Sequence, residues 1–258
     1  MKKLLCCALA AAMSLSVAAP CFAAGSPWDG TWKLNQAKSK MTGSTFTISL
    51  DGGMYTVDTG TIKFQYACDG KDYTIIADRT ISCTGGGNSF TVGIKVAGKP
   101  YSTTHRTISA DGTTLTDVEK GTRPDGTAFT DTETDTRVGS GTGLAGTWQS
   151  TKVKNSASSL FILKVNGDVL HYEDPGYKES SDAKLDGTPA PITGGMAPPG
   201  LMISNKLENG AVTSTVSLNG KPLGTDVMTL SADGKVLTDV SWSAGKENEK
   251  QTYVYDKQ

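Results

Sequence analysis

The tripeptide Gly-Thr-Trp stands at residues 30–32 and again at residues 146–148, and Ser-Ala-Asp-Gly at residues 109–112 recurs at residues 231–234. The offset is 116 residues for the first match and 122 for the second. Matching segments in the same order at nearly the same spacing indicate two tandem copies of one unit.

Within each copy, apolar and polar residues alternate with a period of two. This pattern covers residues 45–50, 61–66 and 90–96 in the first copy, and residues 161–165 and 212–218 in the second. Such alternation is typical of half-buried β-strands. Asp-Gly pairs separate many of these runs and favour tight hairpins, because glycine accepts a positive φ. The sequence therefore predicts an all-β fold of antiparallel neighbouring strands.

A boundary between the copies is expected at residues 139–143, Gly-Ser-Gly-Thr-Gly. Glycines and small polar residues of this kind are typical of a flexible linker. We therefore expect a first domain at residues 24–138, a linker at 139–145 and a second domain at 146–258. A small antiparallel sheet must hide its edges, which a closed barrel or a β-sandwich would both achieve.

The Gly-x-Trp that opens each copy, followed by antiparallel strands, resembles the start of lipocalin-like (calycin) barrels. More narrowly, residues 30–40, 69–73 and 109–116 resemble a family of small secreted bacterial proteins of unassigned function. This resemblance covers most of the first copy and part of the second. It implies two tandem, small, up-and-down antiparallel β-barrels, with a β-sandwich as the alternative.

The same resemblance implies a role for three residues. Trp32 and Trp148 would plug the closed ends of their barrels. Arg137, at the end of the last strand of the first copy, would pack on a plug tryptophan through a cation–π contact. The second copy ends without a corresponding arginine.

Residues 1–23 have the pattern of a cleaved signal peptide: Lys2 and Lys3, an apolar stretch, and a small-x-Ala site ending at Ala23. We therefore expect a periplasmic or secreted protein, with lipidation of Cys21 as the alternative. No later segment has the length and hydropathy of a membrane helix. Outward faces of Thr, Ser and Lys argue against an outer-membrane barrel.

Cys68 and Cys83 are the cysteines that remain after Ala23. An exported protein with a single pair predicts a disulfide, which would stabilise the fold by about 3 kcal/mol in the chain-entropy treatment.

Composition and motifs argue against several classes of function. The formal charge changes from −1 to −3 when Lys2 and Lys3 are removed, and no basic run is present, so no nucleic-acid partner is expected. The histidines, His105 and His171, are not duplicated, and no catalytic, phosphate-binding or metal-binding motif occurs. We therefore expect no enzyme activity, no catalytic residues, no metal and no cofactor.

One acidic position is duplicated: Asp117 and Asp239 both lie in Leu-Thr-Asp-Val. If these side chains face the barrel interior, each could bind a cationic or hydroxyl-bearing ligand or pair with another residue of the protein. Neighbouring Thr residues, Glu119 and Ser241 favour a solvated outer face instead.

Two functions remain open. A binding module would hold a small apolar or amphipathic molecule inside a barrel, whereas a structural or interaction protein of the cell envelope would use the same residues as a dry core. Residues 193–202 are rich in Gly, Pro and Met, which predicts a loop. We interpret it as a connection between strands, with a lid or partner contact as the alternative. The expected barrel lining in the first copy comprises Phe46, Ile62, Phe64, Tyr66, Phe90, Val92 and Ile94.

Overall fold

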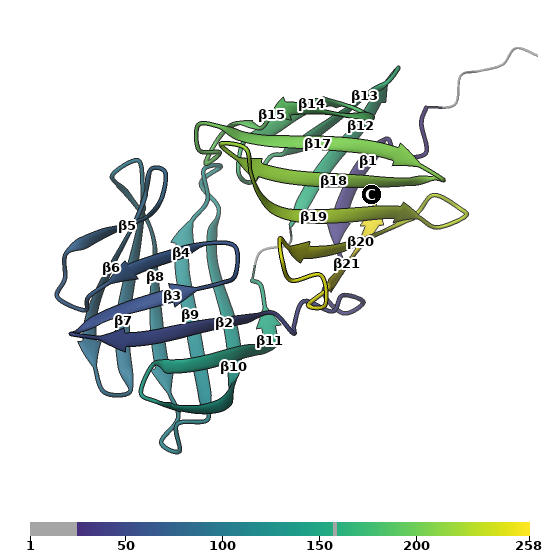
Figure 1. Ribbon diagram of the computed structural model, residues 1–258. Helices are drawn as coiled ribbons and strands as arrows, with labels where there is room; N and C mark the ends of the chain where they lie inside the picture. Colours follow the sequence, from purple (N-terminus) through teal and green to yellow (C-terminus); the bar gives the residue numbers. More distant parts are fainter. Residues whose placement is uncertain (1–24, 157–158) are drawn as a thin grey trace, which may run out of the picture.

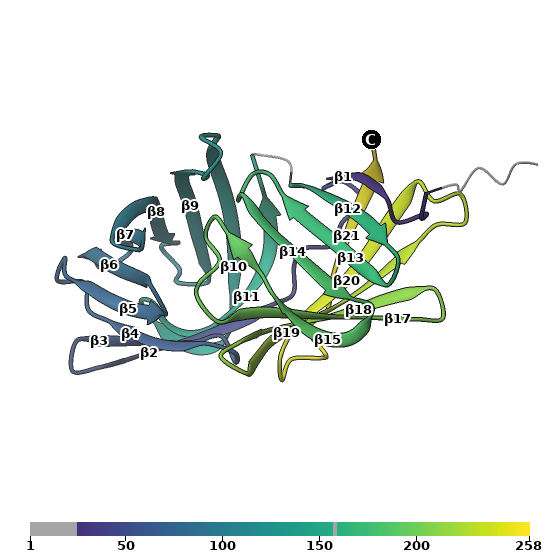
Figure 2. The same cartoon turned by 90° about the horizontal axis from the view of Figure 1, so that it is seen from above.

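A computed structural model describes residues 25–156 and 159–258 of the protein. Within these residues the chain forms 21 β-strands and no helix, so the expected all-β fold is confirmed. The strands build two nearly closed antiparallel barrel-like sheets, barrel 1 and barrel 2 (Figure 1), which lie side by side (Figure 2). The expected signal peptide, residues 1–23, lies outside the described residues.

Barrel 1 contains ten of the described strands, in the order β4-β3-β2-β11-β10-β9-β8-β7-β6-β5. They are β2 (Thr45–Asp51), β3 (Met54–Asp58), β4 (Lys63–Tyr66), β5 (Asp72–Ile76), β6 (Arg79–Gly86), β7 (Ser89–Val96), β8 (Lys99–Ile108), β9 (Thr114–Thr122), β10 (Ala128–Thr142) and β11 (Ala145–Lys154).

Barrel 2 contains the other eleven described strands, in the order β15-β17-β18-β19-β20-β21-β1-β12-β13-β14-β16. They are β1 (Gly30–Leu34), β12 (Leu160–Asn166), β13 (Val169–Asp174), β14 (Glu179–Lys184), β15 (Asp186–Pro191), β16 (Thr193–Gly194), β17 (Leu201–Glu208), β18 (Ala211–Leu218), β19 (Lys221–Leu230), β20 (Val236–Ser243) and β21 (Gln251–Lys257).

The first strand of each repeat belongs to the barrel of the other repeat. Strand β1, which carries Trp32, pairs with β12 and β21 in barrel 2, and purple β1 lies among the strands of that barrel in Figure 1. Strand β11, which carries Trp148, pairs with β2 and β10 in barrel 1. The two barrels therefore do not coincide with the domains expected at residues 24–138 and 146–258.

Residues 139–145 form a hairpin rather than the expected flexible linker. Strand β10 continues to Thr142, β11 begins at Ala145, and these two residues pair across the turn. Gly143 has a φ of 57°, a conformation that glycine adopts at little cost. Glycine and small polar residues are as common in hairpin turns as in linkers, and here the turn joins two neighbouring strands of one barrel.

The two exchanged strands differ in a way that suits their barrels. Leu34 on β1 and Ser150 on β11 occupy the same position after the plug tryptophan. Leu34 pairs across the strands with Tyr255 and belongs to the apolar core of barrel 2. Ser150 pairs with the buried Asp135 in barrel 1. The exchange thus places the apolar side chain beside an aromatic one and the hydroxyl-bearing residue beside an acidic one.

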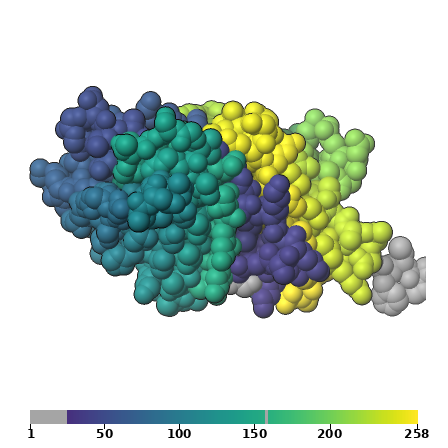
Figure 3. Space-filling model, turned by 90° about the horizontal axis from the view of Figure 1, so that it is seen from below, coloured from purple at the N-terminus to yellow at the C-terminus, as the bar shows by residue number. Residues whose placement is uncertain are grey.

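Residues 35–44 lead from β1 in barrel 2 to β2 in barrel 1, and residues 155–156 follow β11 at the end of barrel 1. They bond to each other, because the Gln36 side-chain amide donates to the Asn155 carbonyl at 2.8 Å and the Asn155 N–H donates to Gln36 Oε1 at 3.2 Å. Figure 3 shows the purple N-terminal segment between the teal surface of barrel 1 and the yellow C-terminal strands.

The edge strands of barrel 1 are β4 and β5, and the expected disulfide spans this seam. Cys68, just after β4, is bonded to Cys83 on β6, the neighbour of β5. The Gly70 N–H also donates to the Cys83 carbonyl at 2.9 Å. The prediction of the disulfide is confirmed, and its place in the fold is that of a clamp on the open side of the sheet.

The seam of barrel 2 contains no cysteine and is covered by the loop at residues 193–202. Its short strand β16 pairs with β14, and the Met196 N–H donates to the Glu179 carboxylate at 3.1 Å. The Met196 carbonyl accepts from Arg79 of barrel 1 at 2.7 Å. The loop therefore closes one barrel and contacts the other.

Candidate functional site

The interior of barrel 2 contains a cavity of about 220 Å³, the lumen cavity. Most of its wall is apolar or aromatic, with four polar side chains in it. The lining is Phe161, Tyr172, Glu179, Ile192, Ile203, Ser214, Val216, Asp226, Met228, Asp239 and Tyr255. These residues come from strands all around the barrel, so the cavity is the space that the barrel encloses. It is larger than the roughly 150 Å³ cavity that holds benzene in another protein.

One of the two repeated tryptophans is buried in each barrel, Trp148 in barrel 1 and Trp32 in barrel 2. In barrel 1, the Arg137 guanidinium lies 4.0 Å from the centre of the Trp148 ring, and the indole N–H donates to the Leu144 carbonyl at 2.9 Å. In barrel 2, the Lys257 ammonium lies 5.1 Å from the Trp32 ring, whose N–H donates to the Trp28 carbonyl at 3.0 Å.

The expected partners are therefore exchanged along with the strands. Arg137 packs on the tryptophan of the following repeat, and Lys257 supplies the cation for which the sequence of the second copy offered no arginine. Glycine stands two residues before each tryptophan, where φ is 149° at both Gly30 and Gly146 and a Cβ would also approach the side chain of Lys257 or Arg137 respectively. Arg137 also donates to the carbonyls of Gly112, Ala145 and Gly143 at 2.6–2.7 Å.

Asp117 and Asp239 line interior cavities, so the solvated outer face favoured by their neighbours is wrong. Side chains alternate along a strand, and Asp117 and Asp239 lie two residues after the fully buried Leu115 and Leu237. Residues two positions apart on a strand face the same side, so the spacing from Leu115 and Leu237 was the signal in the sequence that could have placed both carboxylates inside.

The two carboxylates have different partners. In barrel 1, Arg106 Nε donates to Asp117 Oδ1 at 2.9 Å, and Nη2 donates to Oδ2 at 2.5 Å. Arg106 pairs with Asp117 across β8 and β9, and at the same register in barrel 2, Met228 pairs with Asp239. The second repeat therefore has a methionine where the first has the cation.

Barrel 2 also has a second acid beside Asp239. Asp226 is the diagonal neighbour of Asp239 on the paired strands β19 and β20. Among residues 25–156 and 159–258, neither forms a salt bridge, and Asp239 Oδ1 is buried without a hydrogen-bond partner. Burial raises the pKa of Asp226, and burial and the charge of Asp226 raise the pKa of Asp239.

A row of polar residues crosses the lumen wall at this level. Asn205, Ser214, Asp226 and Ser241 are directly paired on β17, β18, β19 and β20. Ser214 lines the cavity, is 2% exposed, and its hydroxyl has no partner in the structure; Asn205 Oδ1, at 1% exposure, has none either. Buried polar groups are normally satisfied by protein or by water, so the Ser214 hydroxyl in the cavity wall is a candidate contact for a bound molecule.

A cleft of about 450 Å³ lies between the barrels and shares Val216 and Asp226 with the lumen cavity. Phe46 and Glu133 of barrel 1 and Trp242 of barrel 2 also line it. The lumen cavity is therefore next to the cleft, with Asp226 at their common boundary.

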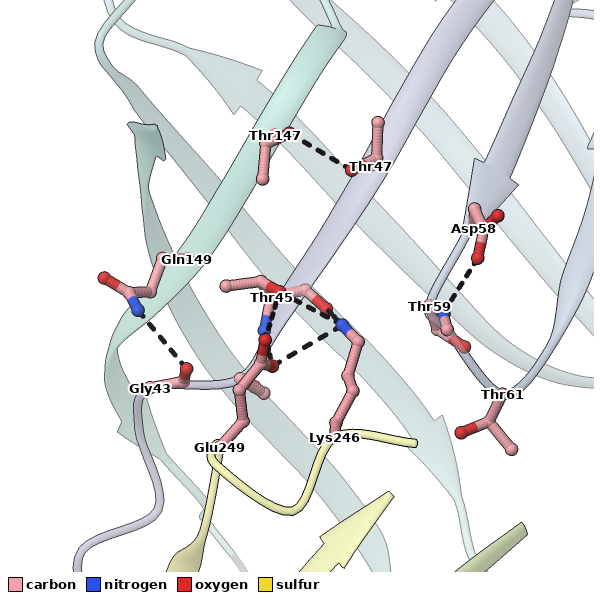
Figure 4. Close-up of polar contacts among 12 residues, drawn as sticks. Gly43, Thr45, Thr47, Asp58, Thr59, Thr61, Thr147, Gln149, Lys246 and Glu249 are labelled. Atoms are coloured by element: carbon pink, nitrogen blue, oxygen red, sulfur yellow. Dashed lines mark hydrogen bonds and ion pairs between the residues drawn. The ribbon is translucent and has the colours of Figure 1, made fainter. Parts of the chain in front are cut away.

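The cleft is bordered by a polar junction that ties the loop after β20 to β2 (Figure 4). The N–H and hydroxyl of Thr45 both donate to the Glu249 carboxylate at 2.7 Å, and the Lys246 ammonium donates to the Thr45 carbonyl. Lys246 and Glu249 form an ion pair at 3.5 Å. These contacts fix the position of one barrel against the other beside the cleft.

The lining expected in the first copy is mostly a packed core. Tyr66, Phe90 and Val92 are buried in barrel 1, and Phe46, Phe64 and Ile94 pack against them. Phe46 also borders the cleft, whereas Ile62 lies in the connection between β3 and β4 and lines a separate surface pocket. The apolar lumen cavity is in the other barrel, for which no lining residues were predicted from the sequence.

Barrel 1 has a cavity of its own, about 210 Å³, whose wall is mostly acidic and polar. Asp117, Glu119, Asp131 and Glu133 line it. Burial and the charges of Glu133 and Asp117 raise the pKa of the adjoining Asp135 to about 7. In the described part of the chain no group of three or more His, Cys, Asp or Glu side chains has an arrangement that could hold a metal ion.

The acid pair predicts an unusual pH dependence of stability. Because the pKa of Asp239 is raised in the folded protein, folding binds a proton, and the free energy of unfolding should fall as pH rises from about 4 to about 8. Asp239→Asn should therefore raise the melting temperature at the higher pH and leave it nearly unchanged at the lower one. Thermal unfolding of both proteins across this range measures the difference.

The matched control is Asp233→Asn, in a turn of the same repeat. The Ser231 hydroxyl and the Lys235 N–H hold the pKa of Asp233 below its usual value. Relative to the parent, Asp233→Asn should therefore become less stable as pH rises, which is the opposite of the effect expected for Asp239→Asn. A gain for Asp239→Asn that is independent of pH would contradict the expected ionisation.

Comparison with known proteins gives no assignment: no family profile matches the chain, and no curated protein matches it. The described residues include no helix able to span a membrane.

Proposed function

We propose that the protein binds a small amphipathic molecule in the lumen cavity of barrel 2 and is not an enzyme. The observation that supports this most directly is an apolar and aromatic cavity whose wall carries unpartnered polar atoms on Ser214 and Asp239. Apolar walls with a few convergent polar groups are typical of small-molecule sites.

Barrel 1 has a different part in this proposal. Its aromatic residues are packed against each other, as in the Tyr55 and Tyr66 rings with centroids 5.6 Å apart. We assign it the structural role: it forms one wall of the cleft beside the lumen cavity and supports the binding barrel.

We further propose that the protein acts in the periplasm or outside the cell after cleavage at Ala23, in keeping with its lipocalin-like sequence features. The disulfide between Cys68 and Cys83 supports an oxidising compartment.

Filling the lumen cavity tests the proposed function. Ile203→Trp places a larger side chain in the cavity wall and should reduce binding of a fluorescent fatty acid or a solvatochromic apolar dye at least tenfold. Leu207→Trp, on the same strand but at a side chain 41% exposed, is the control and should bind as the parent does.

Native mass spectrometry of the exported protein supplies an independent readout. A co-purified small molecule in the parent and its absence in Ile203→Trp would support the proposal. The same spectrum gives the mass of the mature chain, from which the cleavage site follows. Equal dye affinity in both variants, with no co-purified molecule, would refute a lumen site.

A further inference from the structure

We propose that the ligand of barrel 2 is a small primary or secondary amine in its protonated form, carried on an aromatic or short alkyl group. This inference rests on the proposed function and names its substrate class. Three features of the cavity carry it: acids without an internal cation, acceptor atoms without donors, and an aromatic wall.

The first feature comes from comparing the two repeats. In barrel 1, Arg106 neutralises Asp117 through a two-pronged contact. In barrel 2, Met228 stands at the Arg106 register, and Asp226 adds a second carboxylate. A buried carboxylate without a counter-charge is disfavoured and takes up a proton instead, so in barrel 2 a cationic ligand would take the place that Arg106 has in barrel 1.

The second feature concerns hydrogen-bond donors. Asp239 Oδ1 and Ser214 Oγ have no partners, and Ser214 lies directly across from Asp226. Ionised carboxylates only accept hydrogen bonds. An ammonium with N–H groups satisfies them, whereas a quaternary ammonium has no N–H to donate and a carboxylate or phosphate would be repelled.

The third feature is the wall on which the rest of the ligand would lie. Phe161, Tyr172 and Tyr255 form a contiguous aromatic group, with ring centroids 5.7 Å apart for Phe161 and Tyr172 and 4.7 Å apart for Phe161 and Tyr255. Aromatic faces attract both apolar groups and cations. A cavity of about 220 Å³ fits one ring with a short side chain.

Other titratable groups near the acids leave this assignment unchanged. Tyr172, Tyr253 and Tyr255 have a pKa raised by burial, so they stay neutral, and Glu179 adds a further acid to the cavity wall. Amine binding should strengthen as pH rises from about 5 to about 8, because the aspartates ionise while an alkylamine remains protonated.

The test compares three probes of one shape: 2-phenylethylamine, 2-phenylethanol and phenylacetate. Calorimetry or ligand-observed NMR at about pH 8 should give the amine at least tenfold higher affinity than the alcohol, with the acid weakest. Asp239→Asn should remove this preference by weakening the amine alone, and Asp233→Asn should leave it intact.

Met228→Arg is the second variant, because it restores the pairing seen in barrel 1. It should abolish amine binding at every pH and raise the melting temperature at about pH 8 by giving Asp239 a partner.

The outcomes separate the two proposals. If the alcohol or the acid binds as tightly as the amine, or if Asp239→Asn leaves the amine affinity unchanged, the amine inference is overturned while the lumen site stands. If none of the three probes binds and the apolar dye does not bind either, both are overturned.

Discussion

A fragment of residues 42–155 is expected to fold by itself, whereas a fragment of residues 24–138, the first repeat as its sequence bounds it, should be much less stable. The fragment of residues 42–155 contains all ten described strands of barrel 1, including β11 with Trp148. The other lacks β11 and would have to close its barrel with β1.

Strand β1 fits that position poorly. Leu34 would replace Ser150 opposite the buried Asp135, next to the half-buried Glu133. Replacing a polar neighbour of buried acids by an apolar one removes polar solvation from them, at about 1–3 kcal/mol per group, so we expect a deficit of about 2–4 kcal/mol in the free energy of unfolding. The turn at Gly143 would also be replaced by a connection across residues 35–44.

Urea unfolding of the two fragments, followed by circular dichroism, measures this difference. Both contain Cys68 and Cys83, so the disulfide is matched. Equal or greater stability of the 24–138 fragment would show that each repeat closes its own barrel and would contradict the exchange.

The sequence was sufficient to predict the all-β class and the disulfide, because the first depends on local alternation and the second on a single pair of residues. Alternation at residues 90–96 and the Asp-Gly turn at 111–112 are examples: Asp111 accepts from the Thr113 N–H at 3.1 Å, as a turn aspartate does.

The strand exchange could not be predicted in the same way. The two Gly-Thr-Trp strands have the same local pattern, so either strand could pair with the neighbouring strands of either barrel. The residue two positions after the tryptophan, Leu34 or Ser150, is what distinguishes them. That difference has meaning once the neighbour of each position is known, Asp135 beside Ser150 in barrel 1 and Tyr255 beside Leu34 in barrel 2.

The candidate site was missed for a related reason. Asp239 was singled out by its duplication, but its environment depends on Met228 and Asp226, on a neighbouring strand. Ser214 and Asn205 lie on still other strands and carry no motif. A site assembled from single residues of several strands becomes visible through register, which the sequence alone does not specify.

Trp148→Ala is expected to destabilise barrel 1, although Trp148 belongs to the second repeat. The side chain is fully buried in the core that contains Ile48 and Leu144, and its loss removes both the indole hydrogen bond and the surface on which Arg137 lies. Replacing a buried tryptophan by alanine typically costs about 3–5 kcal/mol. Trp242→Ala, at a half-buried residue of β20, should cost about 1 kcal/mol or less.

Hydrogen exchange measured by mass spectrometry locates the effect. In Trp148→Ala, amides of β2 to β10 should exchange much faster, while those of β12 to β21 should stay close to the parent. Trp32→Ala should give the reverse pattern, because Trp32 lies in the core of barrel 2.

Faster exchange confined to β12 to β21 in Trp148→Ala would mean that the tryptophan supports its own repeat. Since Arg137 and Lys257 each pack on the tryptophan supplied by the other repeat, the two patterns together test whether the barrels depend on each other for closure.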